Sequence, residues 1–262
     1  MSILSEIIAK KRERVISAQE AIPFAQVRRE TQEFRRGAKT HALHSALRAE
    51  GINIIAEFKR RSPSKGIIRA GANLQDIVRS YEAGGAVALS VLTEEDYFDG
   101  SLDDLRAAKS AVKLPVLRKD FVFEEYQVYE SAAAGADAIL LIVAALDDQT
   151  LARLRRVAED ELEIDALVEV HTSEEMKRAR AAGATLIGVN NRDLRTFTVS
   201  LETSLSLASE APSEALLVSE SGLNSAADLA RLRDAGYHGF LIGETLMRAG
   251  DPADMLRRLR RV

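Results

Sequence analysis

The sequence predicts an α/β protein folded as one (β/α)8 (TIM) barrel. The first observation is an Ala-Gly pair followed by an apolar run, which recurs about every fifty residues: AGGAVALSVL from Ala83, AGADAILLIV from Ala134, AGATLIGVNN from Ala182 and AGYHGFLIGE from Ala235. Glycine suits the left-handed residue that ends a helix, and such a run is typical of a strand buried on both faces. The second observation is that this spacing fits two strand–helix units. The third is that further strand patterns lie halfway between the repeats: INIIAEFK, LPVLRKDF, IDALVEV and ALLVSES.

Helices are predicted in the gaps, because apolar residues are spaced there on a polar background. The predicted helices are Leu74–Ala83, Leu102–Ala111, Glu124–Ala134, Gln149–Glu161, Ser173–Ala182, Leu201–Glu210, Ser225–Ala235 and Asp254–Arg261. Eight alternations of strand and helix favour a closed barrel. An open doubly wound sheet also alternates, but the Gly-rich loop that usually follows its first strand is absent.

The barrel is predicted to span residues 51–262, after an N-terminal helical extension formed by residues 1–50. Ile3–Ala18 has the pattern of an amphipathic helix, and Lys39–Ala49 that of a second, shorter one. We expect these helices to cap the bottom of the barrel or to lie over its top.

Composition narrows the possible partners and cofactors. A net charge of −4, with 29% charged residues of both signs, gives no general electrostatic case for binding nucleic acid or an anionic membrane. The chain has no cysteine, which excludes disulfides and thiolate metal sites. The N-terminus lacks the apolar core of a signal peptide, and no apolar run is long enough to span a bilayer. We therefore expect a cytoplasmic protein with no metal and no cofactor. We also expect a monomer, with weak self-association left open.

Ionisable and amide side chains lie where the predicted strands end, and parallel strands all end at the rim that carries barrel active sites. They are Glu57 and Lys59 (strand 1), Lys119 (strand 3), Glu169 (strand 5), Asn190 and Arg192 (strand 6) and Glu220 (strand 7). Alternation puts Glu57 and Lys59 on one face, roughly 7 Å apart. Taken singly, each charged residue could simply be a solvated strand end. The Glu57–Lys59 pair could be a structural ion pair, and Asn190 could form a hydrogen bond within a turn. Buried charges cost several kcal/mol each unless paired, so the repeated pattern favours a functional site.

Small polar residues follow several of the same strands. Ser221 and Gly222 follow strand 7, Gly243 follows strand 8 and Ser62 follows strand 1. The loops after strands 7 and 8 of such barrels often bind phosphate through backbone N–H groups. An ordinary strand–helix turn uses the same residue types, so phosphate binding is one of two interpretations here.

The motifs AEFKRRSPS, RKDF, LVEVHT, IGVNNRDL, SESGL and FLIGETLM occur in this order, each at a strand end. Together they resemble the indole-3-glycerol phosphate synthases of tryptophan biosynthesis, and LSEIIAKKRERV is similar to the extra helix of that family. The resemblance covers nearly the whole chain. It implies a cofactor-free carboxy-lyase whose small phosphorylated substrate is 1-(2-carboxyphenylamino)-1-deoxyribulose 5-phosphate. The products would be indole-3-glycerol phosphate, CO2 and water.

The resemblance also implies a role for each site residue. Lys119 would be the general acid of ring closure, and Glu169 the acid or base of the dehydration that follows. Glu57 and Lys59 would be catalytic, with Lys59 near the substrate carboxylate and able to donate a proton. Asn190 and Glu220 would also be catalytic and, with Arg192, would hold the reacting groups. The other residues would bind the substrate: Ser221, Phe98 at the anthranilate ring, and Ser62, Gly222, Gly243 and the backbone of Glu244 at the phosphate.

One departure from the family concerns Glu244, because the family often has serine there and a carboxylate repels phosphate. We expect its backbone N–H to bind while the side chain turns away. The chemistry also leads us to expect that partial burial lowers the pKa of the catalytic lysine towards neutrality.

Three other functions remain open for the same barrel. One is an aldolase-like lyase that forms a Schiff base through Lys59 or Lys119. Another is a non-catalytic barrel that binds sugar phosphates, which would have no need of an acid and base such as Lys119 and Glu169. The third, and weakest, is an isomerase of the same pathway.

Overall fold

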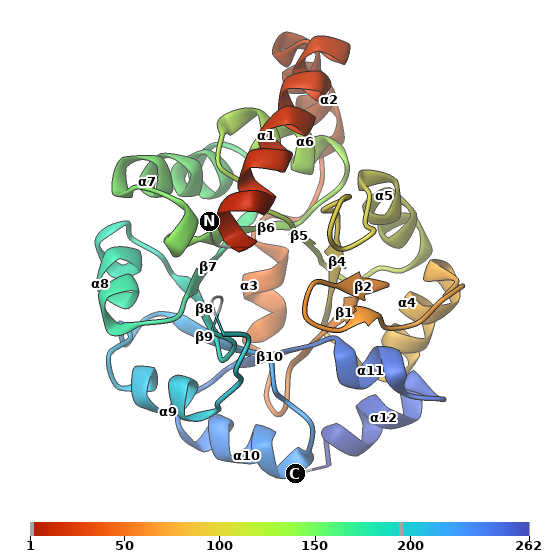
Figure 1. The fold of residues 1–262 in the computed structure, drawn as a ribbon, viewed down its shortest axis with the longest axis vertical. Coiled ribbons are helices and arrows are strands. Elements are labelled where there is room, and N and C mark those ends of the chain that lie inside the picture. The colour runs from red at the N-terminus through yellow and green to blue at the C-terminus, as the bar shows by residue number, and fades with distance from the viewer. Residues whose placement is uncertain (1–2, 194–195, 262) are drawn as a thin grey trace.

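The computed structural model describes residues 3–193 and 196–261, and its centre is a closed barrel of eight parallel strands (Figure 1). The barrel strands are β1 (Ile54–Phe58), β4 (Ala88–Leu92), β5 (Val116–Lys119), β6 (Ala138–Ile142), β7 (Asp165–Val170), β8 (Leu186–Asn190), β9 (Leu216–Glu220) and β10 (Gly239–Ile242). They follow one another around the barrel in chain order, and β10 pairs with β1 to close it. The predicted (β/α)8 fold is therefore confirmed.

Helices surround the strands, as Figure 1 shows. They are α4 (Leu74–Ala83), α5 (Leu102–Ala111), α6 (Glu125–Ala133), α7 (Asp148–Arg156), α8 (Ser173–Ala181), α9 (Glu202–Ala208), α10 (Ala226–Asp234) and α12 (Pro252–Leu259), with a short turn η1 (Val143–Ala145) after β6 and a π turn η2 (Val157–Glu161) after α7. Ser101, Asp147 and Thr172 each accept a backbone N–H in the first turn of their helix. Such caps contribute about 1 kcal/mol each. Gly135 and Gly183, from the repeated Ala-Gly pair, have φ of 95° and 78°, so they end their helices in the left-handed conformation as predicted.

The apolar core has two layers, separated by the wall of the barrel. One layer lies between strands and helices. The other fills the barrel interior and includes Ile55, Leu117, Leu167 and Val218. Side chains alternate along a strand, so the residues two positions further on point inward as well, but at the carboxyl-end rim. This is how the core pattern places the predicted ionisable residues on the inner surface of the mouth.

The N-terminal extension contains three helices: α1 (Ile3–Ala21), α2 (Phe24–Arg35) and α3 (Ala42–Leu47). Leu43 and Leu47 of α3 are fully buried in the interior layer, so α3 closes the bottom of the barrel. In contrast, α1 reaches over the mouth, and α2 packs on α6 (Figure 1). The sequence left open whether the N-terminal helices cap the bottom of the barrel or lie over its top. Both occur, because α3 caps the bottom and α1 lies over the top.

Some elements differ from the sequence prediction. Helix α2 was not predicted, because FAQVRRETQEFR is mostly polar and buries little beyond Val27 and Thr31. The segment after β1 forms a hairpin of β2 (Arg61–Ser62) and β3 (Gly66–Ile67) rather than a simple turn. A short helix α11 (Glu244–Arg248) separates β10 from α12. Across the described ranges, no helix is both long and apolar enough to cross a membrane.

Candidate active site

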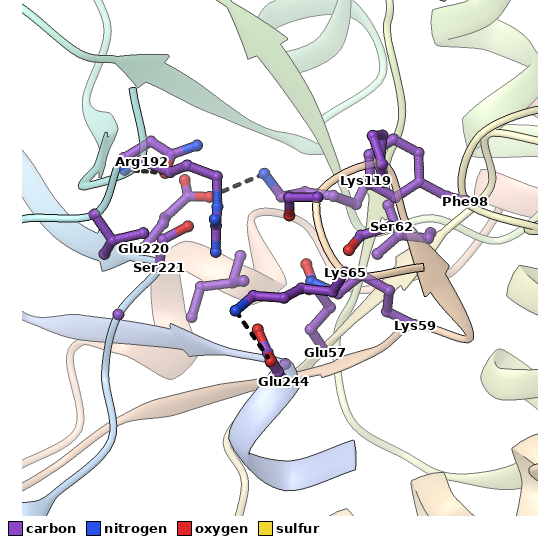
Figure 2. Close-up of a pocket in the computed structure, with 18 of the residues that line it drawn as sticks. Glu57, Lys59, Ser62, Lys65, Phe98, Lys119, Arg192, Glu220, Ser221 and Glu244 are labelled. Atoms are coloured by element: carbon purple, nitrogen blue, oxygen red, sulfur yellow. Dashed lines mark hydrogen bonds and ion pairs between the residues drawn. The ribbon is translucent and has the colours of Figure 1, made fainter. Parts of the chain in front are cut away.

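A cavity of about 680 Å³ opens at the carboxyl ends of the barrel strands (Figure 2). All the site residues predicted from the sequence line it: Glu57, Lys59, Ser62, Phe98, Lys119, Glu169, Asn190, Arg192, Glu220, Ser221, Gly222, Gly243 and Glu244. They come from segments far apart in the chain, and the parallel strands bring them to one rim. The register shows the convergence, since Asn190 at the end of β8 lies beside Glu220 at the end of β9.

Lys119 occupies the centre of this cluster. Its Nζ donates to Glu169 Oε2 and to Glu220 Oε2, each at 2.9 Å. The lysine side chain is 13% exposed, and the two carboxylate side chains are 3% and 2% exposed. The ammonium therefore bridges two buried carboxylates and still reaches the open cavity.

A second acid–amine pair lies across the cavity. Lys59 Nζ donates to Glu57 Oε1 at 2.6 Å, which confirms that alternation puts both side chains on one face. Glu57 is buried against β10, where a Cβ atom on Gly243 would lie 2.3 Å from its Oε1. Gly243 thus makes room for the carboxylate of Glu57.

Glycine also makes room for Glu220. A Cβ atom on Gly188 would lie 2.3 Å from Glu220 Oε1. That oxygen is buried and has no hydrogen-bond partner among the described residues, while the other oxygen accepts from Lys119. Glu220 therefore presents a free acceptor beside the ammonium of Lys119.

The electrostatics of Lys119 contradict one expectation. Burial by itself lowers the pKa of Lys119, but the charges of Glu169, Glu220 and Glu57 outweigh burial and raise the pKa above its ordinary value. The predicted shift towards neutrality was wrong, because the sequence did not reveal that two carboxylates contact the same ammonium. Lys119 is protonated at neutral pH.

The two carboxylates beside Lys119 differ from each other. Burial raises the pKa of both, but for Glu169 the charges of Lys119 and His171 and a hydrogen bond with Asn190 prevail and lower the pKa to about 2. For Glu220 burial prevails over Lys119, and the charge of Glu169 adds to it, which raises the pKa to about 7. Near neutral pH the site therefore holds one firmly ionised carboxylate and one that exchanges its proton.

Arg192 lies at the edge of the cavity after β8. Its backbone N–H donates to Asn190 Oδ1 at 3.0 Å, and its guanidinium donates to the carbonyl of Phe197. Asn190 therefore links Glu169 to the Arg192 segment. Leu194 of the IGVNNRDL motif lies outside the described residues.

The predicted phosphate end of the cavity contains Ser62 and the segments after β9 and β10. Ser221 and Gly222 have φ of 67° and 79°, so two successive residues are left-handed. The Glu244 carboxylate accepts from Arg248 Nε at 3.0 Å and lies 3.9 Å from Lys65 Nζ (Figure 2). Two cations therefore offset the charge of this carboxylate.

Part of the cavity wall is apolar, and most of it was not predicted. The rings of Phe98 and Phe121 lie 6.3 Å apart, and Phe98 is held in place because its backbone N–H donates to Glu94. Ile3 and Ile7 of α1 complete this wall. The i, i+4 spacing of these isoleucines marked one face of a helix, but the sequence did not show what that face covers.

Within the described ranges, one group of carboxylates is close enough to hold a cation: Glu94, Glu95 and Asp96. Glu94 accepts three backbone N–H groups, whereas the other two pair with Lys11 and Arg14. The protein's own donors therefore engage all three.

A closed (β/α)8 barrel with lysines and carboxylates at the carboxyl-end rim has the architecture of the (β/α)8-barrel enzymes. Comparison with known sequences identifies the particular group. The chain belongs to the indole-3-glycerol phosphate synthase family, whose profile matches residues 4–259.

Curated relatives agree with this assignment. The indole-3-glycerol phosphate synthase of Koribacter versatilis (strain Ellin345) is 50% identical over 235 residues, which is 87% of this chain and 90% of that protein. The one from Paracidovorax citrulli (strain AAC00-1) is 46% identical over 265 residues and 98% of both chains. Among solved structures, thiamine phosphate pyrophosphorylase from Pyrococcus furiosus has a TM-score of 0.62 at 16% identity, over 84% of this chain and 96% of that one. At that identity the likeness concerns the fold alone.

Proposed function

We propose that this protein is an indole-3-glycerol phosphate synthase. It would cyclise 1-(2-carboxyphenylamino)-1-deoxyribulose 5-phosphate to indole-3-glycerol phosphate, with loss of CO2 and water. The observation that carries the proposal is the ammonium of Lys119, held between Glu169 and Glu220 in a cavity of a chain that belongs to this family.

Ring closure begins when the aromatic carbon that bears the carboxylate attacks the substrate ketone. Lys119 protonates the ketone oxygen as the C–C bond forms, and loss of CO2 then restores the aromatic ring. A general acid must hold its proton before the reaction, and the raised pKa of Lys119 ensures this. The developing alkoxide is a strong base, so an ammonium ion can still transfer its proton to it.

Dehydration follows ring closure. The new hydroxyl leaves as water after a second protonation, and a carbon next to the nitrogen loses its proton to form the indole. Glu169 is the acid or base of this stage, and Lys59 is placed to donate a proton from across the cavity, paired with Glu57. Glu220 and Asn190 hold the groups that exchange protons in position.

The substrate would bind through two groups of contacts in the cavity, one for its anthranilate part and one for its phosphate. Lys59 and Arg192 supply positive charge for the substrate carboxylate, and Phe98 packs on the anthranilate ring. The phosphate binds at Ser62 and at Gly222, Gly243 and the backbone of Glu244, near strands β9 and β10, and Ser221 binds the substrate beside them. The contacts of the Glu244 carboxylate with Arg248 and Lys65 support this assignment, because the two cations offset the repulsion between this carboxylate and a phosphate.

The deciding experiment is to add the carboxyphenylamino substrate to the purified protein and to follow indole fluorescence. A steady increase without added metal or cofactor is expected. No increase under any condition would reject the proposed activity.

The Schiff-base alternative requires a neutral lysine that attacks a carbonyl. The raised pKa of Lys119 argues against it, since the ammonium has no lone pair. Borohydride trapping with substrate tests this directly, and a covalent adduct on Lys119 or Lys59 would favour the alternative. A non-catalytic sugar-phosphate binder or an isomerase would produce no indole in the same assay. As part of the proposal, the protein acts as a cytoplasmic monomer with no nucleic-acid or membrane partner.

A further inference from the structure

His171 directly follows β7, and its imidazole lies between two carboxylates. Nε2 lies 3.5 Å from Glu169 Oε1, and Nδ1 lies 3.2 Å from Glu175 Oε2 in the first turn of α8. Glu169 is 3% exposed, His171 is 11% exposed and Glu175 is 18% exposed. Three titratable groups therefore form a row that leads outward from the floor of the active site.

The middle residue of this row, His171, reaches a second hollow. His171 lines that hollow with Thr172 and Ser173 at the start of α8 and with the segment 200–207 around α9. Glu169 lines the active-site cavity and not the hollow, while His171 lines the hollow and not the cavity. His171 therefore contacts both sides: its Nε2 faces Glu169, which lines the reaction chamber, and its side chain lines the outer hollow.

Among the described residues, the imidazole nitrogen that faces the active site, Nε2, makes no hydrogen bond that would explain its position. Nε2 is buried and has no hydrogen-bond partner in the described part of the chain. A buried polar atom without a partner costs free energy, so its position facing Glu169 calls for an explanation. A proton that moves from Nε2 to Glu169 would supply one.

The proposed reaction requires protons from outside. One proton is added to the ketone oxygen and one to the leaving hydroxyl, whereas only one is released from carbon. The substrate carboxylate leaves as CO2 without its own proton, so each turnover consumes one proton. Lys119 and Glu169 line the cavity that the substrate would fill, so a route for this proton that avoids the mouth would serve the reaction.

We propose that His171 is the proton-exchange residue of this site, carrying protons between solvent in the outer hollow and Glu169. The inference rests on the proposed function. Once Lys119 has given its proton to the ketone, the charge that keeps Glu169 ionised is gone, so the pKa of Glu169 rises. Nδ1 then takes up a proton beside Glu175, Nε2–H gives its proton to Glu169 Oε1, and the ring is left neutral with its proton on Nδ1. Only N–H and O–H bonds change. His171 acts through Glu169 and does not touch substrate, so it is a positioning residue rather than a catalytic one.

The charges around the imidazole support this role. Burial lowers the pKa of His171, but the hydrogen bond with Glu175 and the charges of Glu169 and Glu220 raise it above its ordinary value. Lys119 lies on the far side of Glu169. The imidazolium is thus available near neutral pH, where the reaction must draw its proton.

The test compares His171→Ala and His171→Gln with the wild type, using indole fluorescence at saturating substrate. We expect kcat to fall about tenfold in both variants, below the ~10²–10⁴ of a group that acts on substrate itself. KM should stay close to its wild-type value. Added imidazole should raise kcat of His171→Ala with its concentration, because the small acid enters through the outer hollow, and should leave wild-type kcat unchanged.

His44→Ala is the matched control, since His44 lies on α3 at the opposite end of the barrel. It should retain wild-type kcat and show no response to imidazole. If His171→Ala does not fold, His171→Gln still decides, because glutamine fills the space and carries no exchangeable charge. Wild-type kcat in His171→Gln, or a low kcat in His171→Ala that imidazole does not restore, would overturn the inference. An inactive wild type would instead reject the proposed function, and this inference with it.

Discussion

Lys11 Nζ lies 2.8 Å from the carboxylate of Asp120, the residue that directly follows Lys119. Both side chains are almost fully buried, and Arg118 and Thr93 contact the same carboxylate. Lys11 also pairs with Glu95 at 2.9 Å. One buried ion pair therefore joins α1, which covers the mouth, to the end of the strand that carries Lys119.

Replacing Lys11 with methionine should weaken this connection. Breaking a buried pair by removing one partner costs about 3–5 kcal/mol, and Arg118 still neutralises Asp120, so we expect the lower end of that range. Urea denaturation measures the loss in the free energy of unfolding, and KM should rise because α1 supplies part of the cavity wall. Lys10→Met changes the preceding, half-exposed lysine and should have little effect on either. Equal effects of the two substitutions would contradict this role.

Lys119→Ala should lower kcat by about 10²–10⁴-fold, because among the described residues Lys119 is the ammonium that contacts both Glu169 and Glu220 and can protonate the ketone. Substrate should still bind, since the phosphate and ring contacts lie elsewhere in the cavity. Calorimetric titration measures binding and indole fluorescence measures turnover. Lys177→Ala, at an exposed lysine of α8, is the control. A near-normal kcat in Lys119→Ala would show that another group is the general acid.

Glu169→Gln should slow the dehydration and spare ring closure. In a single turnover, release of CO2 reports closure and indole fluorescence reports the final step. We expect CO2 to appear at close to the wild-type rate while indole formation falls by about 10²-fold. The exposed Glu174 gives the control Glu174→Gln. If CO2 and indole slow together, Glu169 acts before or during ring closure.

Gly188→Ala should damage activity more than stability. Its Cβ atom would lie 2.3 Å from Glu220 Oε1, at the flexible end of a side chain, so Glu220 must move away from Lys119. Removing an interaction of this kind should lower kcat roughly tenfold or more. The unfolding midpoint should change little. Gly250→Ala is a suitable control, because a Cβ atom there has no neighbour within 4 Å. Wild-type kcat in Gly188→Ala would mean that the position of Glu220 does not matter.

Glu220 should also make stability depend on pH. Its pKa is raised from 4.5 to about 7, so the folded state holds a proton that the unfolded chain has already lost. The folded state binds more protons in this window, and Glu220 therefore lowers the free energy of unfolding as pH rises from about 4.5 to about 7. Glu220→Gln lacks this effect, so its stability relative to the wild type should increase over that window. Urea denaturation at pH 5 and pH 8 measures the change, and a constant difference between the two proteins would refute it.

The fold was predictable because its signals are local and repeated. The Ala-Gly pairs marked helix ends, and the strands buried on both faces read as apolar runs. The convergence of the candidate site residues on one cavity was predictable for a related reason. Side chains alternate along a strand, so the inward-facing positions could be followed to the end of each strand at the rim. Helix α2 was missed because its surface is mostly polar and its stability comes from packing on α6.

Relations between distant segments were harder to predict. The pKa of Lys119 depends on two carboxylates that lie fifty and about a hundred residues away, and no local pattern gives their distances. The apolar wall formed by Ile3 and Ile7 depends on where α1 lies. The role of Gly188 could not be predicted either. Its lack of a side chain matters because Glu220 Oε1 occupies that space, and this contact is visible only in the folded structure.

Helix α3 fills the end of the barrel opposite the mouth with Leu43 and Leu47. Substrate and product must therefore enter and leave by the same opening, the mouth of the barrel. In the proposed reaction, indole-3-glycerol phosphate must vacate the entrance before a new substrate can arrive, so the two should compete for free enzyme. Carbon dioxide, which is small and uncharged, can slip past the occupant and depart first.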